Sequence, residues 1–251
     1  MFRVGIQAHS PRDGSASWRP ARFAAVVVEE LTQQIISGEL PVDEVLPTEP
    51  ALCEQFGFSR TVIREALKLL EERGLVRVEQ GRGTTVQPRD SWNLLDPVVL
   101  RIALAHDPDM TLLDDLVQVR RVLEQEMACA AATRLSEDEL AALSENLELM
   151  RSAFGDYDRF RAYDLAFHAI VMKASGNEIG LTIVRVIHQH GGVTPLLSAG
   201  SSRAALEETA DEHRDILAAL AARDGELAGE LIAAHIGHAY AERKGRAKKK
   251  T

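Results

Sequence analysis

The apolar positions from residue 97 to residue 243 repeat at intervals of three and four residues almost throughout, and no alternating strand pattern interrupts them. Proline, glycine and serine positions divide this stretch into a series of expected helices. These helices are expected at Val98–Ala105, Leu112–Arg134, Glu137–Ala153, Tyr157–Ala174, Glu178–Gln189, Ala204–Ala222 and Gly225–Arg243. Residues 98–243 are therefore predicted to form an all-α helical bundle.

Residues 20–88 carry a different pattern, in which helical and strand patterns follow one another at short intervals. A helix over Arg22–Ser37 precedes a pair of helices that are separated at Gly57. Leu75–Glu79 then alternates apolar and polar residues as a half-buried strand does, and Thr84–Gln87 returns after a tight turn. This order of elements predicts a winged helix-turn-helix domain.

The helix pair has recognisable ends and buried faces. We expect the hydroxyls of Thr48 and Ser59 to cap the first and the second helix of the pair. In the first helix the residues expected to face inward are Ala51, Leu52 and Phe56. In the second helix the spacing predicts one buried stripe, made of Ile63, Ala66, Leu67 and Leu70.

The other face of the second helix carries candidate DNA contacts. Arg60, Arg64 and Lys68 recur every four residues and therefore share one face. An arginine in the major groove can bind guanine O6 and N7 with two hydrogen bonds. Ser59 and Thr61 flank Arg60, and Arg82 lies at the tip of the predicted wing. The alternative for each cation is a solvated surface charge, which the surrounding helix-turn-helix pattern makes less favourable.

The length and composition of the chain limit the classes of protein to which it can belong. The chain has 251 residues, enough for two domains, and its formal net charge is −9. An acidic chain is an unusual DNA-binding protein, but the cations cluster between Arg60 and Arg82. Two cysteines give no disulfide framework, and no apolar run approaches the roughly 20 residues of a membrane span. We therefore expect a cytoplasmic protein without a membrane partner.

The segments outside these two domains are expected to be simple connections. Residues 1–19 lack periodicity and are predicted to form a mobile N-terminal arm, and residues 244–251 a basic, disordered tail. Residues 89–97 are predicted to be a linker. Within it, Trp92 and the two leucines that follow are expected to dock onto one of the domains.

A candidate metal site lies in the helical stretch. Asp164 and His168 are four residues apart on one expected helix, and His213 and His235 lie on two later helices. Three imidazoles and a carboxylate suit Zn²⁺, Ni²⁺ or Mn²⁺. The alternative is that these are ordinary surface or hydrogen-bonded core histidines. Among the other histidines, His238 is a fallback ligand, and His188 and His190 are weaker candidates. His9 and His106 are expected to be surface residues.

The N-terminal region resembles the GntR family of bacterial winged helix-turn-helix regulators. The residues that carry the resemblance are Ile35–Leu40, Leu46–Glu49, Ser59–Leu67, Gly74–Leu75 and Gly81–Thr84. The resemblance implies that Arg60 and Arg64 contact bases or phosphates, and that the wing enters the minor groove. Pro50 departs from the family, in which a basic residue commonly supplies another DNA contact at this position.

The helical region resembles the FCD ligand-binding domain of the FadR branch of the same family. The matching stretches are Arg120–Glu124, Asp164–His168, Ala174–Asn177 and Glu212–Leu217. The resemblance implies that Asp164, His168, His213 and His235 hold a divalent metal. The linker stretch Trp92–Pro97 is similar to that of galactonate-type repressors of sugar-acid operons, which implies a sugar-acid effector.

These features together favour a homodimeric regulator, in particular a repressor, that binds a palindromic DNA operator. Residues 98–243 would bind the effector and form the dimer. A small carboxylate would bind at the metal with help from Arg120 and Asn177. For Arg120 an equally favourable partner is Glu124, four residues further along the same helix.

Two other functions remain open from the residues. The first is a metal-dependent hydrolase or lyase fused to a DNA-binding module. However, the sequence contains no Gly-x-Ser-x-Gly, no His-Glu-x-x-His and no phosphate-binding loop. The second is a structural DNA-binding protein in which the histidines are plain core residues.

Overall fold

The computed structural model describes residues 19–190 and 202–248 of the chain. The contacts within the chain separate two compact units, residues 1–93 and residues 94–251. The arm predicted at 1–19 therefore lies outside the described residues except for Arg19, and so does the end of the tail at 249–251. His9 also lies outside them.

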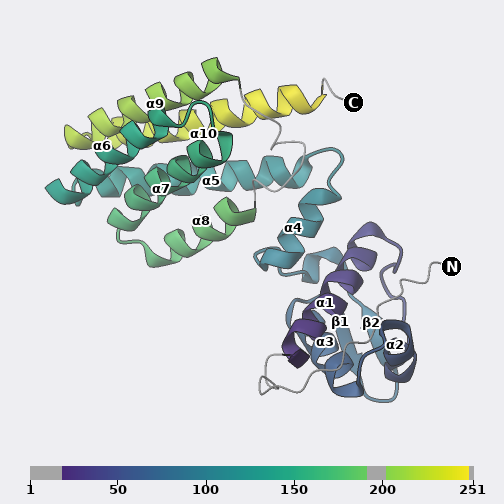
Figure 1. Cartoon of the computed structure of the whole chain (residues 1–251). Coiled ribbons are helices and arrows are strands. Elements are labelled where there is room, and N and C mark those ends of the chain that lie inside the picture. Colours follow the sequence, from purple (N-terminus) through teal and green to yellow (C-terminus); the bar gives the residue numbers. More distant parts are fainter. Residues whose placement is uncertain (1–18, 191–201, 249–251) are drawn as a thin grey trace, which may run out of the picture. The chain divides into compact units, whose positions relative to one another are not determined.

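The first unit is a three-helix core with a two-stranded wing (Figure 1). Its elements are α1 (Arg19–Ser37), α2 (Glu49–Phe56), α3 (Arg60–Glu72), β1 (Val76–Glu79), β2 (Gly83–Val86) and the short 3₁₀ helix η1 (Arg89–Ser91). The strands are antiparallel, with Val76 opposite Val86 and Glu79 opposite Gly83. Buried side chains of α1 and α3 form the centre of this core, because these two helices pack against each other.

The stripe predicted on the second helix of the pair is confirmed, since Ile63, Ala66, Leu67 and Leu70 are all buried on α3. Two finer expectations are wrong. Ala51 is exposed, and only Leu52 of α2 is fully buried. Thr48 and Ser59 occupy the N-cap positions of α2 and α3, but their side chains make no capping hydrogen bond.

The linker up to Asn93 contacts the first unit, whereas the two leucines that follow belong to the second unit and Leu95 is 49% exposed. The indole Nε1 of Trp92 donates to the carbonyl of Gln87 at 3.0 Å, and the amide of Asn93 donates to the carbonyl of Arg73 at 2.9 Å. The chain passes so close to Gly74 that a Cβ there would lie 1.9 Å from the carbonyl oxygen of Ser91. Gly74 also has a φ of +72°, so only glycine fits this crossing without strain.

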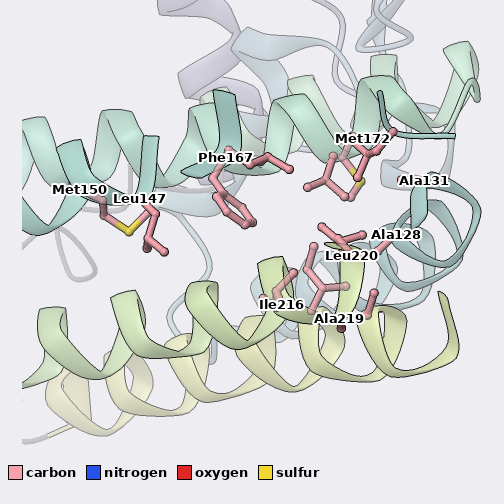
Figure 2. Packing of buried hydrophobic residues seen from close by; sticks show 14 of the residues in the cluster. Ala128, Ala131, Leu147, Met150, Phe167, Met172, Ile216, Ala219 and Leu220 are labelled. Carbon is pink, nitrogen blue, oxygen red and sulfur yellow. The ribbon is translucent and has the colours of Figure 1, made fainter. Parts of the chain in front are cut away.

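The second unit is entirely helical in its described residues, as predicted. Its helices are α4 (Pro97–Ala105), α5 (Thr111–Ala132), α6 (Glu137–Ser152), α7 (Tyr157–Ala174), α8 (Glu178–His190), α9 (Arg203–Ala221) and α10 (Gly225–Lys248). Buried side chains of α5 to α10 form one apolar cluster (Figure 2), in which Phe167 of α7 lies near Leu147 and Met150 of α6.

The last helix runs beside α5 and α9 (Figure 1). Its approach to α5 is close, because a Cβ at Gly229 would lie 2.9 Å from the carbonyl oxygen of Gln125. Its predicted end at Arg243 is wrong, since α10 continues to Lys248. Lys244 bonds both oxygens of Asp114 on α5, at 2.6 and 2.7 Å, and this tertiary contact holds a turn that was expected to be disordered.

Candidate functional site

The exposed face of α3 carries the candidate DNA contacts. Arg60, Thr61, Arg64 and Lys68 are all exposed, while the opposite face packs into the core. Ser59 is exposed at the start of the helix, and Arg82 is exposed in the turn between β1 and β2. The fold therefore presents the cationic side chains of Arg60, Arg64, Lys68 and Arg82 without using any of them in the apolar core.

Three of these cations have acidic neighbours. Arg64 Nε contacts both carboxylate oxygens of Glu49 on α2, at 3.1 and 2.9 Å. Lys68 lies 3.6 Å from Glu72, and Arg82 lies 3.6 Å from Glu79. Such exposed pairs contribute about 0–1 kcal/mol each, so phosphate or base edges can replace them at small loss. Glu49 orients Arg64 from another helix, a role that its place in the sequence did not indicate.

The candidate metal ligands converge from three helices. Asp164 and His168 lie on α7, His213 on α9 and His235 on α10. One candidate ligand atom from each of the four lies within 4.8 Å of the others. The histidine side chains are at most 4% exposed and that of Asp164 is 18% exposed, so the group is shielded from bulk water.

Each of these histidines uses its Nδ1 atom for a contact outside the group. His168 Nδ1 lies 2.7 Å from Glu124 Oε2, His213 Nδ1 lies 2.8 Å from the carbonyl oxygen of Thr209, and His235 Nδ1 lies 2.7 Å from Glu212 Oε2. A carbonyl or ionised carboxylate oxygen can only accept, so each Nδ1 carries the proton. In the neutral ring each Nε2 then keeps a lone pair, which is the form in which imidazole binds a metal.

The arrangement fits a cation better than it fits a plain core. His213 Nε2 is buried and has no hydrogen-bond partner, and it lies 3.3 Å from Asp164 Oδ1, which is also an acceptor. An unsatisfied buried acceptor costs about 1–3 kcal/mol. A divalent ion would satisfy this lone pair, and three imidazoles with one carboxylate are donors that Zn²⁺, Ni²⁺ and Mn²⁺ accept.

The protonation of His213 gives a pH prediction for the metal-free protein. Burial, reinforced by the charge of His235, lowers the pKa of His213 to about 3. An unfolded histidine titrates near pH ~6.5. Between these values the unfolded state binds a proton that the folded state excludes, so stability falls as the pH falls through this window. At pH 5 the expected loss is about 2 kcal/mol relative to pH 7.

Urea unfolding of chelator-treated protein at pH 7 and pH 5 measures this loss. His213→Leu removes the titrating group and keeps an apolar side chain of similar size, so its stability should fall less on acidification. An identical pH dependence in both proteins would show that His213 is not the group responsible.

A second cluster lies on the far side of His168. The Glu124 carboxylate is fully buried and accepts hydrogen bonds from His168, from His188 Nε2 at 2.9 Å and from Arg120 Nε at 2.7 Å. Burial alone would raise the pKa of Glu124, but Arg120 and the two histidines hold it well below its usual range. Although Glu124, His168 and His188 could also hold an ion, their contacts are hydrogen bonds to an ionised carboxylate.

In this cluster the Nε of Arg120 pairs with Glu124, which is one of the two partners expected for it. Asn177, the other predicted effector contact, makes a local hydrogen bond in this structure. It is exposed, and its Oδ1 accepts from the amide of Gly180 at 2.9 Å, which caps the start of α8.

The structure also shows the surroundings of the fallback ligand His238 and of the expected surface residue His106. His238 is 70% exposed and bonds Glu212 Oε1 at 2.7 Å, so it supports a neighbour of the group rather than joining it. His106 is exposed at the end of α4, as expected. The side chain of His190 is not among those described. No described helix is long and apolar enough to cross a membrane.

Comparisons with known proteins agree with this two-part organisation. The family described as "Bacterial regulatory proteins, gntR family" matches residues 23–86, and the FCD domain matches residues 115–238. The galactonate operon transcriptional repressor of Escherichia coli K12 is 30% identical over 202 residues, which cover 80% of this chain and 88% of that protein.

Two further similarities are informative. The Glc operon transcriptional activator of Escherichia coli K12 is 34% identical over 159 residues, 61% of each chain. A solved structure titled for Lar, which controls the expression of the Listeria monocytogenes agr system, superposes with a TM-score of 0.57 at 19% identity. It covers 94% of this chain and 99% of that one, and at this identity the likeness concerns the fold alone.

Proposed function

Because this chain belongs to the GntR family of bacterial transcription regulators and carries an FCD domain, we propose that it is a homodimeric repressor controlled by a small carboxylate. The effector would bind beside a divalent metal in the helical unit and change operator binding by the first unit. The observation that carries this proposal is the convergence of three buried imidazoles and Asp164 in a unit that follows a winged helix-turn-helix.

In this proposal Asp164, His168, His213 and His235 hold the ion. When bound, an ion that prefers six ligands supplies open positions for a carboxylate and a neighbouring hydroxyl of the effector. Glu124, Thr209 and Glu212 hold the three imidazole rings through their Nδ1 atoms, which would leave every Nε2 available to an ion.

Arg120 is the candidate partner for the effector carboxylate. Its side chain is 20% exposed, and its bond to Glu124 uses Nε. The terminal nitrogens of a guanidinium carry further N–H donors that suit a carboxylate. A separate open pocket of about 340 Å³ between α9 and α10 suits an anion poorly, because Glu208 and Glu212 line it.

The chemical class of the effector follows from the metal and from the relatives. A chelating effector needs a carboxylate and a second oxygen donor, such as the adjacent hydroxyl of sugar acids and small hydroxy acids. A relative regulates a galactonate operon, so a sugar acid is our first proposal, while lactate, pyruvate and dicarboxylates are tested beside it. Repression is proposed from the same relative, although an activator is also among the relatives.

The dimer is proposed because the winged helix-turn-helix domain is small. A single small winged domain contacts few base pairs, whereas a two-fold symmetric pair reads a palindromic site with adequate specificity. The matched families and the relatives named above are transcription regulators, so the enzyme alternative raised by the metal ligands is rejected. As a regulator of bacterial operons, the protein would act in the cytoplasm.

A thermal-shift screen tests the proposed effector and its metal dependence together. Galactonate, lactate, pyruvate and succinate are added to zinc-loaded protein, to chelator-treated protein and to chelated protein with zinc restored. An acid present at about 100 times its Kd should stabilise the loaded protein by about 2.7 kcal/mol, which raises Tm by roughly 5–10 °C.

The chelated sample should lose the shift, and restored zinc should return it. An equal shift without metal would reject the metal-bound carboxylate, and no shift with any of the acids would reject this effector class.

A further inference from the structure

The carboxylate of Glu124 joins three helices at one buried point. Its Oε2 accepts from His168 Nδ1 of α7 at 2.7 Å. Its Oε1 accepts from Arg120 Nε of its own helix α5 at 2.7 Å and from His188 Nε2 of α8 at 2.9 Å. The Glu124 side chain is 0% exposed, so these donors replace water around a buried charge.

The contact with His168 has a direct consequence for its other ring nitrogen. A carboxylate that accepts the Nδ1 proton fixes the tautomer and the ring orientation, and it makes Nε2 a stronger electron donor. In the described structure the equivalent contacts of the other two histidines come from the Thr209 carbonyl and from Glu212, which is half-buried. His168 thus receives the most deeply buried of the three supporting contacts.

We propose that Glu124 is the positioning residue of the metal centre and that it makes the metal centre and the proposed carboxylate-binding Arg120 interdependent. This inference rests on the proposed function. Glu124 does not itself bind the ion, because Arg120 and His188 occupy Oε1 and His168 occupies Oε2. The effect of Glu124 passes through the orientation and basicity of His168.

Glu124→Gln tests the proposal with little change in shape. A glutamine amide keeps one acceptor oxygen, but its NH₂ group faces either His168 or the Arg120–His188 pair, and both of these donate. Zinc affinity, measured by competition with a chelating dye, should fall about 10- to 100-fold. The visible spectrum of bound Co²⁺ should also change, because it reports the geometry of the ligands.

Two matched variants separate positioning from general damage. Glu124→Asp keeps the charge and should bind zinc more tightly than Glu124→Gln. Glu126→Gln makes the same chemical change at an exposed position of α5 and should bind zinc like the wild type. Zinc affinity of Glu124→Gln within twofold of the wild type would overturn the proposal.

If circular dichroism shows that Glu124→Gln does not fold, two variants of His188 test the proposal in its place. His188→Gln retains a donor near Nε2, whereas His188→Leu removes it, and neither change replaces a proposed metal ligand. Weaker zinc binding by His188→Leu than by His188→Gln would support the positioning role of Glu124, and equal zinc binding by the two variants would overturn that role. Failure of the wild-type protein to bind zinc would instead overturn the proposed function.

Discussion

Arg60→Ala or Arg64→Ala is expected to lower operator affinity more than any other single change in the first unit. Both side chains project from the exposed face of α3, and each can make a bidentate contact with guanine. Such a contact is worth about 1–3 kcal/mol for each half-site, so a two-fold dimer should lose about 2–6 kcal/mol. This corresponds to a fall in affinity of roughly 30-fold to more than 10,000-fold.

Fluorescence anisotropy with a palindromic duplex selected from a random pool measures this loss. The salt concentration must be held constant, because phosphate contacts make the affinity depend on it. Lys173→Ala is the matched control, since it removes one exposed positive charge from the helical unit. Wild-type affinity in either arginine variant would show that α3 is not the recognition helix.

The second large effect is expected at the metal ligands. His213→Ala removes a fully buried imidazole whose Nε2 faces Asp164 at 3.3 Å. Structural zinc sites contribute about 10–16 kcal/mol in total, so one of four ligands accounts for roughly 3 kcal/mol, or about a 100-fold loss of zinc affinity. His168→Ala should have an effect of similar size, and both variants should lose the thermal response to the effector.

Metal content after dialysis, measured by mass spectrometry, is the primary test of this expectation. His106→Ala serves as the control, because His106 is exposed at the end of α4. Operator binding without effector should survive in both ligand variants, since their substitutions lie outside the residues of the first unit. Unchanged metal content in both variants would refute the proposed site.

Most of the fold could be predicted because its signals are local. A period near 3.6 residues and the glycine, proline and serine breaks locate helices from neighbouring residues alone. The wrong predictions concern the ends of helices. Pro20 is compatible with a first helical turn, so α1 begins at Arg19 rather than at Arg22. The end of α10 depends on Asp114, more than a hundred residues earlier in the chain.

The candidate site shows the same limit of local signals. The sequence offered Asp164 and His168 on one helix and His213 and His235 on two later ones, and the family resemblance implied that all four hold a metal. Nothing local indicated Glu124 as a supporting residue, because its histidine partners lie 44 and 64 residues away. For Arg120, the spacing of four residues allowed a pair with Glu124 but could not exclude an effector contact.

By itself the sequence determined which side chains belong to helices and which kinds of donor are available for DNA and metal. Only the tertiary structure decided that the Nδ1 atoms of His168, His213 and His235 all point to acceptors. The physical reason is that periodicity arises from contacts within one or two helical turns, whereas the direction of an imidazole ring is set by the packing of separate helices.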